Sequence, residues 1–406
     1  MPTKFVSYLD KGAEIFLYLL ILGIPFSKSA VEVSILALLF CWLVKRILQK
    51  DASFPETPMT TPWLIFLFVC ALSLLMTHNI ELSLRALFTK YIKYFLLFIA
   101  ISEFLKKNPP LLKRIGVVFL VSFALVMLDS LIQFVTGTDV AGKKLQIIYI
   151  EPKDRMRISA SLSHPNCFGT YLIGAIPFLF ASFVYCFKNK MKSLLCGTLV
   201  LLSLIALYFT YSRGAFIALI ISVLATLLLW KKKIALIVFA ASLIFVFLAP
   251  SPFTQSLRQS FNFSMNASGS IKDRLRLWKS AIDMVQERPL LGWGLNTYTE
   301  VNPLFVKDFD AWYPHNCYLQ MASEIGLVGL ASFLILLISF FLSFYRGFLS
   351  AKSPFEKLIA AAFLTSFLAM AFHAFVDTNF YSLPLIALFW TVCSIGHAYV
   401  TAHQKF

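Results

Sequence analysis

Three residues at the boundaries of apolar segments could together perform chemistry on a phosphate-linked substrate. His315 lies in a Pro-His-Asn triplet immediately before a long apolar run, Arg213 lies in the turn "TYSRGAF" between two such runs, and Arg274 lies in "IKDRLRLWKSAIDMVQERP". Guanidinium groups bind phosphate oxygens in a bidentate manner, and a neutral imidazole can accept the proton of a hydroxyl group. The three residues are therefore candidate catalytic residues for displacing a phosphate leaving group.

A second group of polar residues precedes another apolar run, in "RMRISASLSHPNCFGTYLIGAIPF". Arg155 and Arg157 could bind an anion. His164 could contact a sugar or form a structural hydrogen bond, and Asn166 could contact substrate or cap the helix that follows. Both interpretations stay open for His164 and Asn166, so all four residues are candidate substrate-binding residues.

The sequence gives no indication of a metal site or a cofactor. It has no H-E-x-x-H pattern, its six histidines are sparse, and its seven cysteines stand singly without a C-x-x-C pair. We therefore expect basic side chains, rather than a metal ion, to neutralise the leaving group. Cys167 and Cys317 each follow an Asn near the end of an apolar segment, and they could form a disulfide only if they lie close together.

The elements that carry these residues are predicted from the hydropathy of the chain. Of its 406 residues, 59% are hydrophobic and 14% are charged, which is too apolar for a soluble domain of this size. Apolar runs that approach the roughly 20 residues needed to cross a bilayer recur from end to end and predict an all-α polytopic membrane protein with about twelve transmembrane helices in a single domain, residues 1–406. The expected spans are residues 12–26, 31–48, 62–76, 82–101, 114–135, 168–187, 193–211, 214–230, 234–249, 317–345, 358–376 and 381–400.

Basic residues in the links between these segments predict the orientation of the chain. Lys and Arg residues cluster in alternate links, and such enrichment marks the cytoplasmic side of a membrane protein. Both termini are therefore expected in the cytoplasm. Most of the net charge of +16 then reflects membrane topology and does not imply nucleic-acid binding. Two long loops, residues 136–166 and 251–316, fall on the outer side, and their basic residues suggest an anionic ligand there.

The second outer loop contains an amphipathic helix that is expected to begin near Ser270 and to end at Pro289. Its expected apolar stripe consists of Leu275, Trp278, Ile282 and Val285. At about 100° per residue, Arg274 lies roughly 60° from the centre of this stripe and Arg276 roughly 140° from it. Arg274 should therefore face the interface with the membrane helices and Arg276 should face water. Arg276 is kept as the alternative substrate-binding arginine.

Charged residues also occur within the expected membrane segments. Lys90 and Lys93 lie in the segment 82–101, and Asp129 lies in the segment 114–135 at a similar depth. A buried charge in a membrane needs a partner or a function. Lys90 or Lys93 could therefore pair with Asp129, and Lys90 is also a candidate substrate-binding residue.

Four segments, taken together and in order, resemble one known family. The segments "HPNCFGTYL", "TYSRGAF", "DRLRLWKSAIDMVQERPLLGWGLNTY" and "PHNCYLQMASEIGLVGL" are similar to motifs of the O-antigen ligase family, in the Wzy_C superfamily of membrane glycosyltransferases. The resemblance extends over residues 164–380. The turn arginine of the family corresponds to Arg213, its loop-helix arginine to Arg274, and its histidine before Asn to His315, which implies catalytic roles for these three residues.

The resemblance implies an enzyme of the bacterial inner membrane whose active site faces the periplasm. O-antigen ligases transfer a glycan from undecaprenyl diphosphate to a hydroxyl group of the lipid A-core in lipopolysaccharide biosynthesis, with inversion at the transferred sugar and without metal or ATP. We therefore expect an undecaprenyl-diphosphate-linked glycan donor, a lipid A-core acceptor and membrane lipids as partners. The loops 136–166 and 251–316 would then be periplasmic.

Several alternatives stay open at this level. The superfamily also contains O-antigen and exopolysaccharide polymerases, which use the same donor with a glycan acceptor. It further contains protein-glycosylating ligases, which are usually longer at the C-terminus and often have Gln where this chain has His164. A polyprenyl-linked lipid transporter would also use many helices and buried charges. A scaffold of a polysaccharide assembly complex would leave His315 and both arginines without a role.

Overall fold

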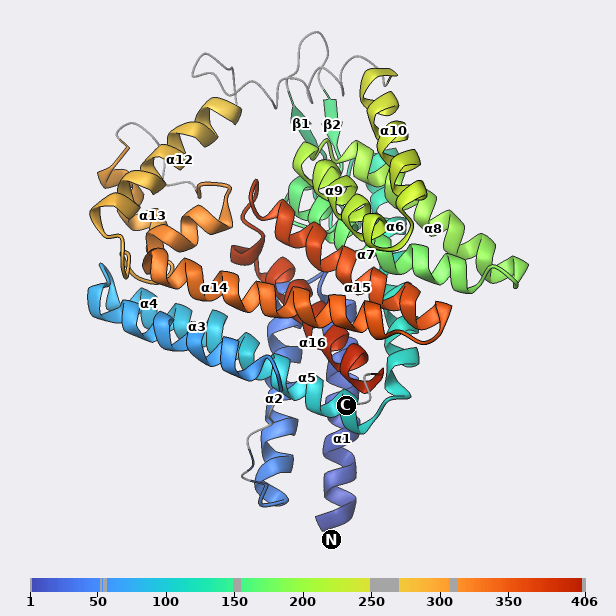
Figure 1. Ribbon diagram of the computed structural model, residues 1–406, viewed down its shortest axis with the longest axis horizontal. Coiled ribbons are helices and arrows are strands. Elements are labelled where there is room, and N and C mark those ends of the chain that lie inside the picture. The colour runs from blue at the N-terminus through green and yellow to red at the C-terminus, as the bar shows by residue number, and fades with distance from the viewer. Residues whose placement is uncertain are drawn as a thin grey trace.

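The computed structural model describes residues 2–51, 53, 57–148, 155–248, 270–306 and 313–403. Within these residues the chain is almost entirely helical, and it forms one short antiparallel sheet of two strands (Figure 1). The expected all-α architecture is therefore confirmed.

The elements follow one another along the chain with short connections. Before the first outer loop they are α1 (Pro2–Gly23), α2 (Lys28–Leu48), α3 (Thr60–Leu72), η1 (Ser73–Met76), α4 (Ile80–Ala86), the π-helix η2 (Leu87–Ile92), α5 (Lys93–Lys107) and α6 (Leu111–Thr136). From that loop onward they are β1 (Gln146–Ile148), β2 (Arg155–Arg157), α7 (Pro165–Tyr185), α8 (Lys190–Phe209), α9 (Arg213–Trp230), α10 (Lys232–Leu248), α12 (Ser270–Glu287), α13 (Tyr298–Val301), η3 (Asn302–Leu304), α14 (Cys317–Ser350), α15 (Pro354–His373), η4 (Asn379–Tyr381) and α16 (Leu383–His403).

Seven of the described helices are long and apolar enough to cross a membrane. They are Leu111–Thr136, Pro165–Tyr185, Lys190–Phe209, Arg213–Trp230, Cys317–Ser350, Pro354–His373 and Leu383–Ala402. A shorter apolar helical segment spans Thr60–Met76. The chain is thus a multi-pass membrane protein, and the expected total of about twelve spans stays a prediction.

Helix α16 lies at the centre of the helix bundle. In the most apolar stretch of 18 residues in this helix, 94% of the residues are buried inside the protein. The helix contacts α5, α7, α14 and α15. Its Trp390 contacts Trp63 of α3, with ring centroids 4.4 Å apart, and Phe340 of α14 at 5.8 Å. Large aromatic side chains thus hold the central helices together, and α14 and α15 run side by side across the bundle (Figure 1).

The turn of residues 374–382, between α15 and α16, brings several helix ends together. The backbone N–H of Cys317, at the start of α14, donates to the carbonyl oxygen of Ala374 at 2.8 Å. A Cβ atom added at Gly214, at the start of α9, would lie 2.5 Å from Val376, so glycine permits this close contact. Thr170 of α7 donates a hydrogen bond to Asn379 at 3.0 Å. The turn is therefore held by α7, α9 and α14 at once.

The expected pairing of Lys90 or Lys93 with Asp129 is wrong. The ammonium group of Lys93 forms an ion pair with Glu32 at 2.6 Å, and that of Lys90 donates to the side-chain oxygen of Asn296. One carboxylate oxygen of Asp129 accepts the backbone N–H of Val140 at 2.8 Å. The reason is helix adjacency, because α5 packs against α2 and α16 whereas α6 packs against α1 and α8.

Two further expectations concern cysteines and the outer loops. Cys167 and Cys317 are both free thiols, so the disulfide considered for them is not formed. The described part of the first outer loop contains the β1–β2 hairpin, in which Gln146 pairs with Arg157. The amphipathic helix of the second outer loop is present as α12, which begins at the expected Ser270.

Candidate functional site

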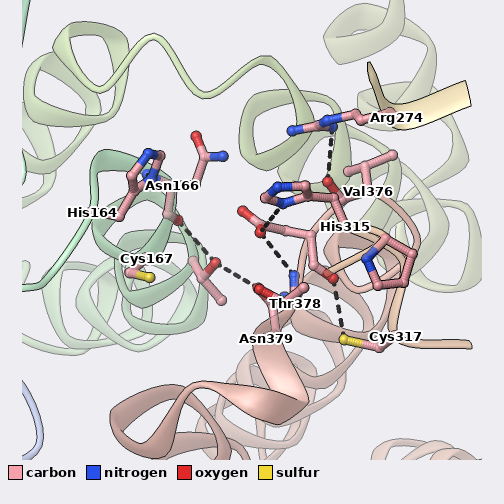
Figure 2. Close-up of polar contacts among 12 residues, drawn as sticks. His164, Asn166, Cys167, Arg274, His315, Cys317, Val376, Thr378 and Asn379 are labelled. Carbon is pink, nitrogen blue, oxygen red and sulfur yellow. Dashed lines mark hydrogen bonds and ion pairs between the residues drawn. The ribbon is translucent and has the colours of Figure 1, made fainter. Parts of the chain in front are cut away.

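The candidate site lies where the starts of α7, α9 and α14 meet the turn 374–382. In the close-up view, Arg274 and His315 lie on one side of the site, and His164 and Asn166 lie on the other (Figure 2). Segments that are far apart in the sequence therefore supply its side chains.

His315 stands two residues before the start of α14 and pairs with a carboxylate. Its Nδ1 atom lies 3.3 Å from Oδ1 of Asp377, and the backbone N–H of Thr378 donates to the same oxygen at 2.8 Å. A carboxylate that accepts from Nδ1–H leaves Nε2 of the imidazole free to accept a proton. Such a pair could act as a general base and the carboxylate that orients it.

The backbone around His315 fixes the position of the imidazole. The side chain of Asn316 caps α14 by accepting the N–H groups of Tyr318 and Leu319, each at 3.0 Å. His315 itself has a φ of 49°, in the left-handed region that a β-carbon disfavours. The cap and the left-handed residue together turn the imidazole toward the turn 374–382.

Asp377 is a member of the site that sequence reasoning missed. Its side chain is buried, and burial favours the neutral acid, but the hydrogen bond with His315 and favourable electrostatic interactions with His373, His315 and Arg274 outweigh this effect and lower its pKa well below the usual range. The carboxyl group is therefore ionised at neutral pH. The available signal was an isolated Asp in "FHAFVDTNF", directly after an apolar segment.

Arg274 projects from α12 onto the same turn. One of its guanidinium nitrogens donates to the carbonyl oxygen of Val376 at 2.9 Å, one residue before Asp377. Burial lowers the pKa of Arg274, and the charge of Asp377 opposes this effect. Arg276 is exposed, as the helix phase predicted.

The apolar face of α12 is rotated relative to the expected stripe. Leu277, Ala281 and Met284 are almost fully buried, whereas Ile282, which was placed in the stripe, is 44% exposed. The reason is that this face packs on a small core formed by the following part of the same loop, in which Trp293, Tyr298 and Val301 take part. Arg276 is nevertheless more exposed than Arg274, as predicted. The reason is that Arg274 lies at the edge of both the expected apolar stripe and the observed buried face of α12.

Two further guanidinium groups lie near Arg274. Arg213 is the first residue of α9, and Arg157 is the last residue of β2. Arg157 donates to the carbonyl oxygen of Thr210 at 2.6 Å and to the side-chain oxygen of Asn166 at 2.7 Å. Burial lowers the pKa of Arg157 to about 10; the charge of Asp377 opposes the shift, and repulsion from Arg213 and Arg274 adds to it. All three remain cationic at neutral pH.

At the start of α7, the residue that caps the helix differs from the one considered in the sequence analysis. The helix cap is His164 rather than Asn166, because Nδ1 of His164 accepts the N–H of Asn166 at 3.1 Å. Asn166 instead accepts the hydrogen bond from Arg157. Burial and the charge of Arg157 lower the pKa of His164 to about 4, so this imidazole is neutral at neutral pH. Below this layer, the hydroxyl of Thr170 lies 2.9 Å from Nδ1 of His373.

Not every candidate residue gathers at the site. Lys90 belongs to a separate polar cluster around Asn296, and Arg276 faces away. The backbone of Arg155 is described as the first residue of β2, while its side chain lies outside the described part of the structure. Among the residues that the structure describes, no group of three or more His, Cys, Asp or Glu side chains could hold a metal ion.

The site combines an imidazole, a carboxylate paired with it and a concentration of positive charge. His315 and Asp377 form the first part, and Arg157, Arg213 and Arg274 form the second. Such an arrangement suits a reaction in which a hydroxyl loses its proton while a phosphate group leaves with negative charge.

A comparison with protein-family models bears on the segment that carries the three residues Arg213, Arg274 and His315. Residues 198–334 match the family model described as O-Antigen ligase, Wzy_C. The chain is also 30% identical over 114 residues to a Rickettsia conorii protein named "Putative polysaccharide ligase". That alignment covers 26% of this chain and 27% of the relative, so it spans about a quarter of the relative's length. The resemblance to the O-antigen ligase family predicted from the motifs is thus confirmed, over residues 198–334 of the chain.

Proposed function

We propose that the protein transfers a glycan from undecaprenyl diphosphate to an acceptor hydroxyl at the periplasmic face of the bacterial inner membrane. The observation that carries this proposal is the convergence of three arginines on the His315–Asp377 pair. The match of residues 198–334 to O-Antigen ligase supports the reaction class, because it contains Arg213, Arg274 and His315.

In the proposed mechanism, His315 acts as the general base. Nε2 takes the proton of the acceptor hydroxyl while its oxygen attacks the anomeric carbon of the donor sugar from the side opposite the phosphate. The bond between the sugar and the phosphate breaks, and the configuration at the transferred sugar is inverted. Asp377 stabilises the imidazolium that forms, and removing one such group from an active site typically costs orders of magnitude in rate.

The arginines act on the leaving group. Arg213 and Arg274 bind the oxygens of the diphosphate as negative charge develops, and Arg157 adds a third guanidinium from β2. Asn166 holds Arg157 in place through its side-chain oxygen. Because these groups are partly buried, their charges are screened less than they would be in water and stabilise the transition state more strongly.

The proposed acceptor is the lipid A-core, which makes the protein an O-antigen ligase of lipopolysaccharide biosynthesis. The clusters of basic residues in alternate links support termini in the cytoplasm and a periplasmic site. The outer loops 136–166 and 251–316 then carry β1, β2 and α12 toward the substrates. The name of the Rickettsia relative, a polysaccharide ligase, agrees with a glycan donor.

Reconstitution of the full chain in lipid nanodiscs tests this proposal. An undecaprenyl-diphosphate-linked glycan would be supplied with lipid A-core or with a second lipid-linked glycan. We expect a glycosylated lipid A-core in the first reaction. Elongation of the second lipid-linked glycan instead would identify a polymerase, and absence of transfer to either acceptor would overturn the proposal.

A further inference from the structure

A second buried polar cluster lies on α14, nine residues after His315. Its centre is Glu324, whose side chain is 1% exposed although it belongs to one of the apolar helices long enough to cross a membrane. A carboxylate in such a place is costly unless every oxygen finds donors. The hydrogen-bond donors around Glu324 therefore show which segments of the chain its carboxylate connects.

The carboxylate of Glu324 accepts three hydrogen bonds from three different parts of the chain. Gln320 of the same helix donates at 2.9 Å, the backbone N–H of Asn296 donates at 2.8 Å, and the hydroxyl of Tyr381 donates at 3.1 Å. Asn296 follows α12 in the second outer loop, and Tyr381 lies near the end of the turn 374–382, which contains Asp377. One side chain thus joins three segments that each contribute to the site.

Lys90 closes this cluster from the side of η2. Its ammonium group donates to the side-chain oxygen of Asn296 and lies 5.2 Å from the ring centroid of Tyr381. Its positive charge also lies close enough to interact with Glu324. Lys90 therefore has a structural explanation that does not require contact with substrate.

A break in α14 makes room for the outer loop at this point. Gly326 has a φ of 71° and a ψ of 179°, which interrupts the helix. The carbonyl oxygens freed by this break accept hydrogen bonds from the loop. The backbone N–H of Trp293 donates to the carbonyl oxygen of Ser323 at 3.1 Å, and that of Gly294 donates to the carbonyl oxygen of Glu324 at 2.7 Å. A Cβ atom added at Gly326 would lie 2.1 Å from the carbonyl oxygen of Leu290, so the contact tolerates only glycine.

We infer that Glu324 is a positioning residue, which holds the outer loop bearing Arg274 and the turn bearing Asp377 in register with His315. The inference rests on the proposed function. Each of the three site residues comes from one of the segments that meet at Glu324: Arg274 from the loop before Asn296, Asp377 from the turn before Tyr381, and His315 from the start of α14. Misplacement of a reacting group by about 1 Å can reduce a rate by roughly 10²-fold.

The substitution Tyr381→Phe tests this inference most directly. It removes only the hydroxyl that links the turn to Glu324 and keeps the ring beside Lys90. With the lipid-linked donor and the acceptor that the wild type uses, we expect kcat to fall by about ten- to a hundredfold, with KM for both substrates changed by less than about twofold. In the folded fraction of the protein, Glu324→Gln should lower kcat at least as much as Tyr381→Phe does.

Tyr399→Phe is the matched control, since Tyr399 is also buried but lies 18 residues further along the chain in α16. Tyr399 is 16 residues beyond Leu383, the first residue of α16, which corresponds to roughly 24 Å at about 1.5 Å per residue. The control should keep the wild-type kcat. Hydrogen exchange of residues 374–382 provides a second readout, and we expect faster exchange in Tyr381→Phe than in Tyr399→Phe.

The possible outcomes separate this inference from the proposed function. An active wild type with unchanged kcat in Tyr381→Phe would overturn the positioning role alone. Equal losses of kcat and of thermal stability in both tyrosine variants would also overturn it, since they would indicate a general effect on stability. A wild type without transfer would overturn the proposed function. In that case, unchanged exchange at residues 374–382 would also refute the link through Glu324.

Discussion

Two regions of the molecule concentrate charged side chains, and they balance their charges differently. In the cluster between α1, α2 and α5, the basic residues are matched to carboxylates: Lys45 to Asp10 at 2.5 Å, Arg46 to Glu103 at 2.8 Å and Lys107 to Glu103 at 2.6 Å. Paired charges of this kind contribute to helix packing.

The candidate site has more positive than negative charge. Arg157 and Arg274 donate to neutral oxygen atoms of Thr210, Asn166 and Val376. The nearby carboxylate of Asp377 is already engaged by His315 and by a backbone N–H. Holding several cations together at this site costs free energy that an anionic ligand would recover. The comparison therefore distinguishes charges that are paired within the fold from charges that, in the proposed function, bind an anionic substrate.

Loss of the base should have the largest effect on transfer. In His315→Ala no group remains to accept the proton of the hydroxyl, so kcat should fall by about 10²- to 10⁴-fold. The rate of glycan transfer by reconstituted protein measures this loss. His78→Ala, at an exposed histidine, is the control and should keep wild-type activity. Substantial transfer by His315→Ala would refute the role as general base.

Removal of an arginine from the site should have the next largest effect. Arg274→Ala and Arg213→Ala each remove one guanidinium group that would stabilise the negative charge of the leaving phosphate. We therefore expect kcat to fall by about 10²- to 10³-fold. Arg274→Lys should restore only part of the rate, because an ammonium group cannot bind phosphate in a bidentate manner. Single-turnover kinetics with the lipid-linked donor would separate this loss from weaker binding. Full activity of either alanine variant would contradict the proposed charge compensation.

Asp377→Asn should reduce transfer without abolishing it. The amide keeps the shape of the side chain but cannot stabilise the imidazolium by charge, so we expect a loss of about ten- to a hundredfold in kcat. Asp129→Asn, at another buried aspartate, is the matched control in α6. Equal activity of the two variants would show that the carboxylate of Asp377 does not act through His315.

A substitution in the ion-pair cluster between α1, α2 and α5 should affect the stability of the protein rather than the rate of glycan transfer. Arg46→Ala removes one partner of Glu103, which keeps Lys107 and the indole N–H of Trp42. The free energy of unfolding should fall by about 1–3 kcal/mol, while kcat per folded molecule stays unchanged. Thermal unfolding in detergent, followed by an activity assay of the folded fraction, measures both quantities. A large loss of kcat without loss of stability would contradict the comparison.

Arg276→Ala should have the smallest effect. The side chain is exposed on α12, and we expect transfer to change by less than about twofold. The assay is the one used for Arg274→Ala, so the two variants serve as a matched pair on one helix. A severe loss in Arg276→Ala would mean that the substrate approaches the other face of α12.

Much of the local structure could be predicted from the sequence. The apolar segments predicted helices, and the sequence placed the amphipathic helix of the second outer loop near Ser270, where α12 begins. The motifs that resemble the O-antigen ligase family placed Arg213, Arg274 and His315 in one group, and the fold brings their helix ends to one turn. Their catalytic roles stay predictions.

Contacts between distant segments could not be predicted in the same way. Asp377 was missed because its pairing with His315 joins residues 62 positions apart. Lys93 was assigned the wrong partner for the same reason, since similar depth in the membrane does not decide which helices are neighbours. The buried face of α12 was also misplaced, because the helix packs on its own loop as well as on the bundle.

The sequence by itself determined that the chain is a helical membrane protein and which residues are able to bind phosphate or move a proton. These properties follow from hydropathy, from local hydrogen bonds and from the chemistry of single side chains. Only the tertiary structure decided that Asp377 faces His315 and that Glu324 joins the outer loop to the turn 374–382. Such contacts depend on which helices pack side by side, and packing is settled by the shapes of many side chains at once.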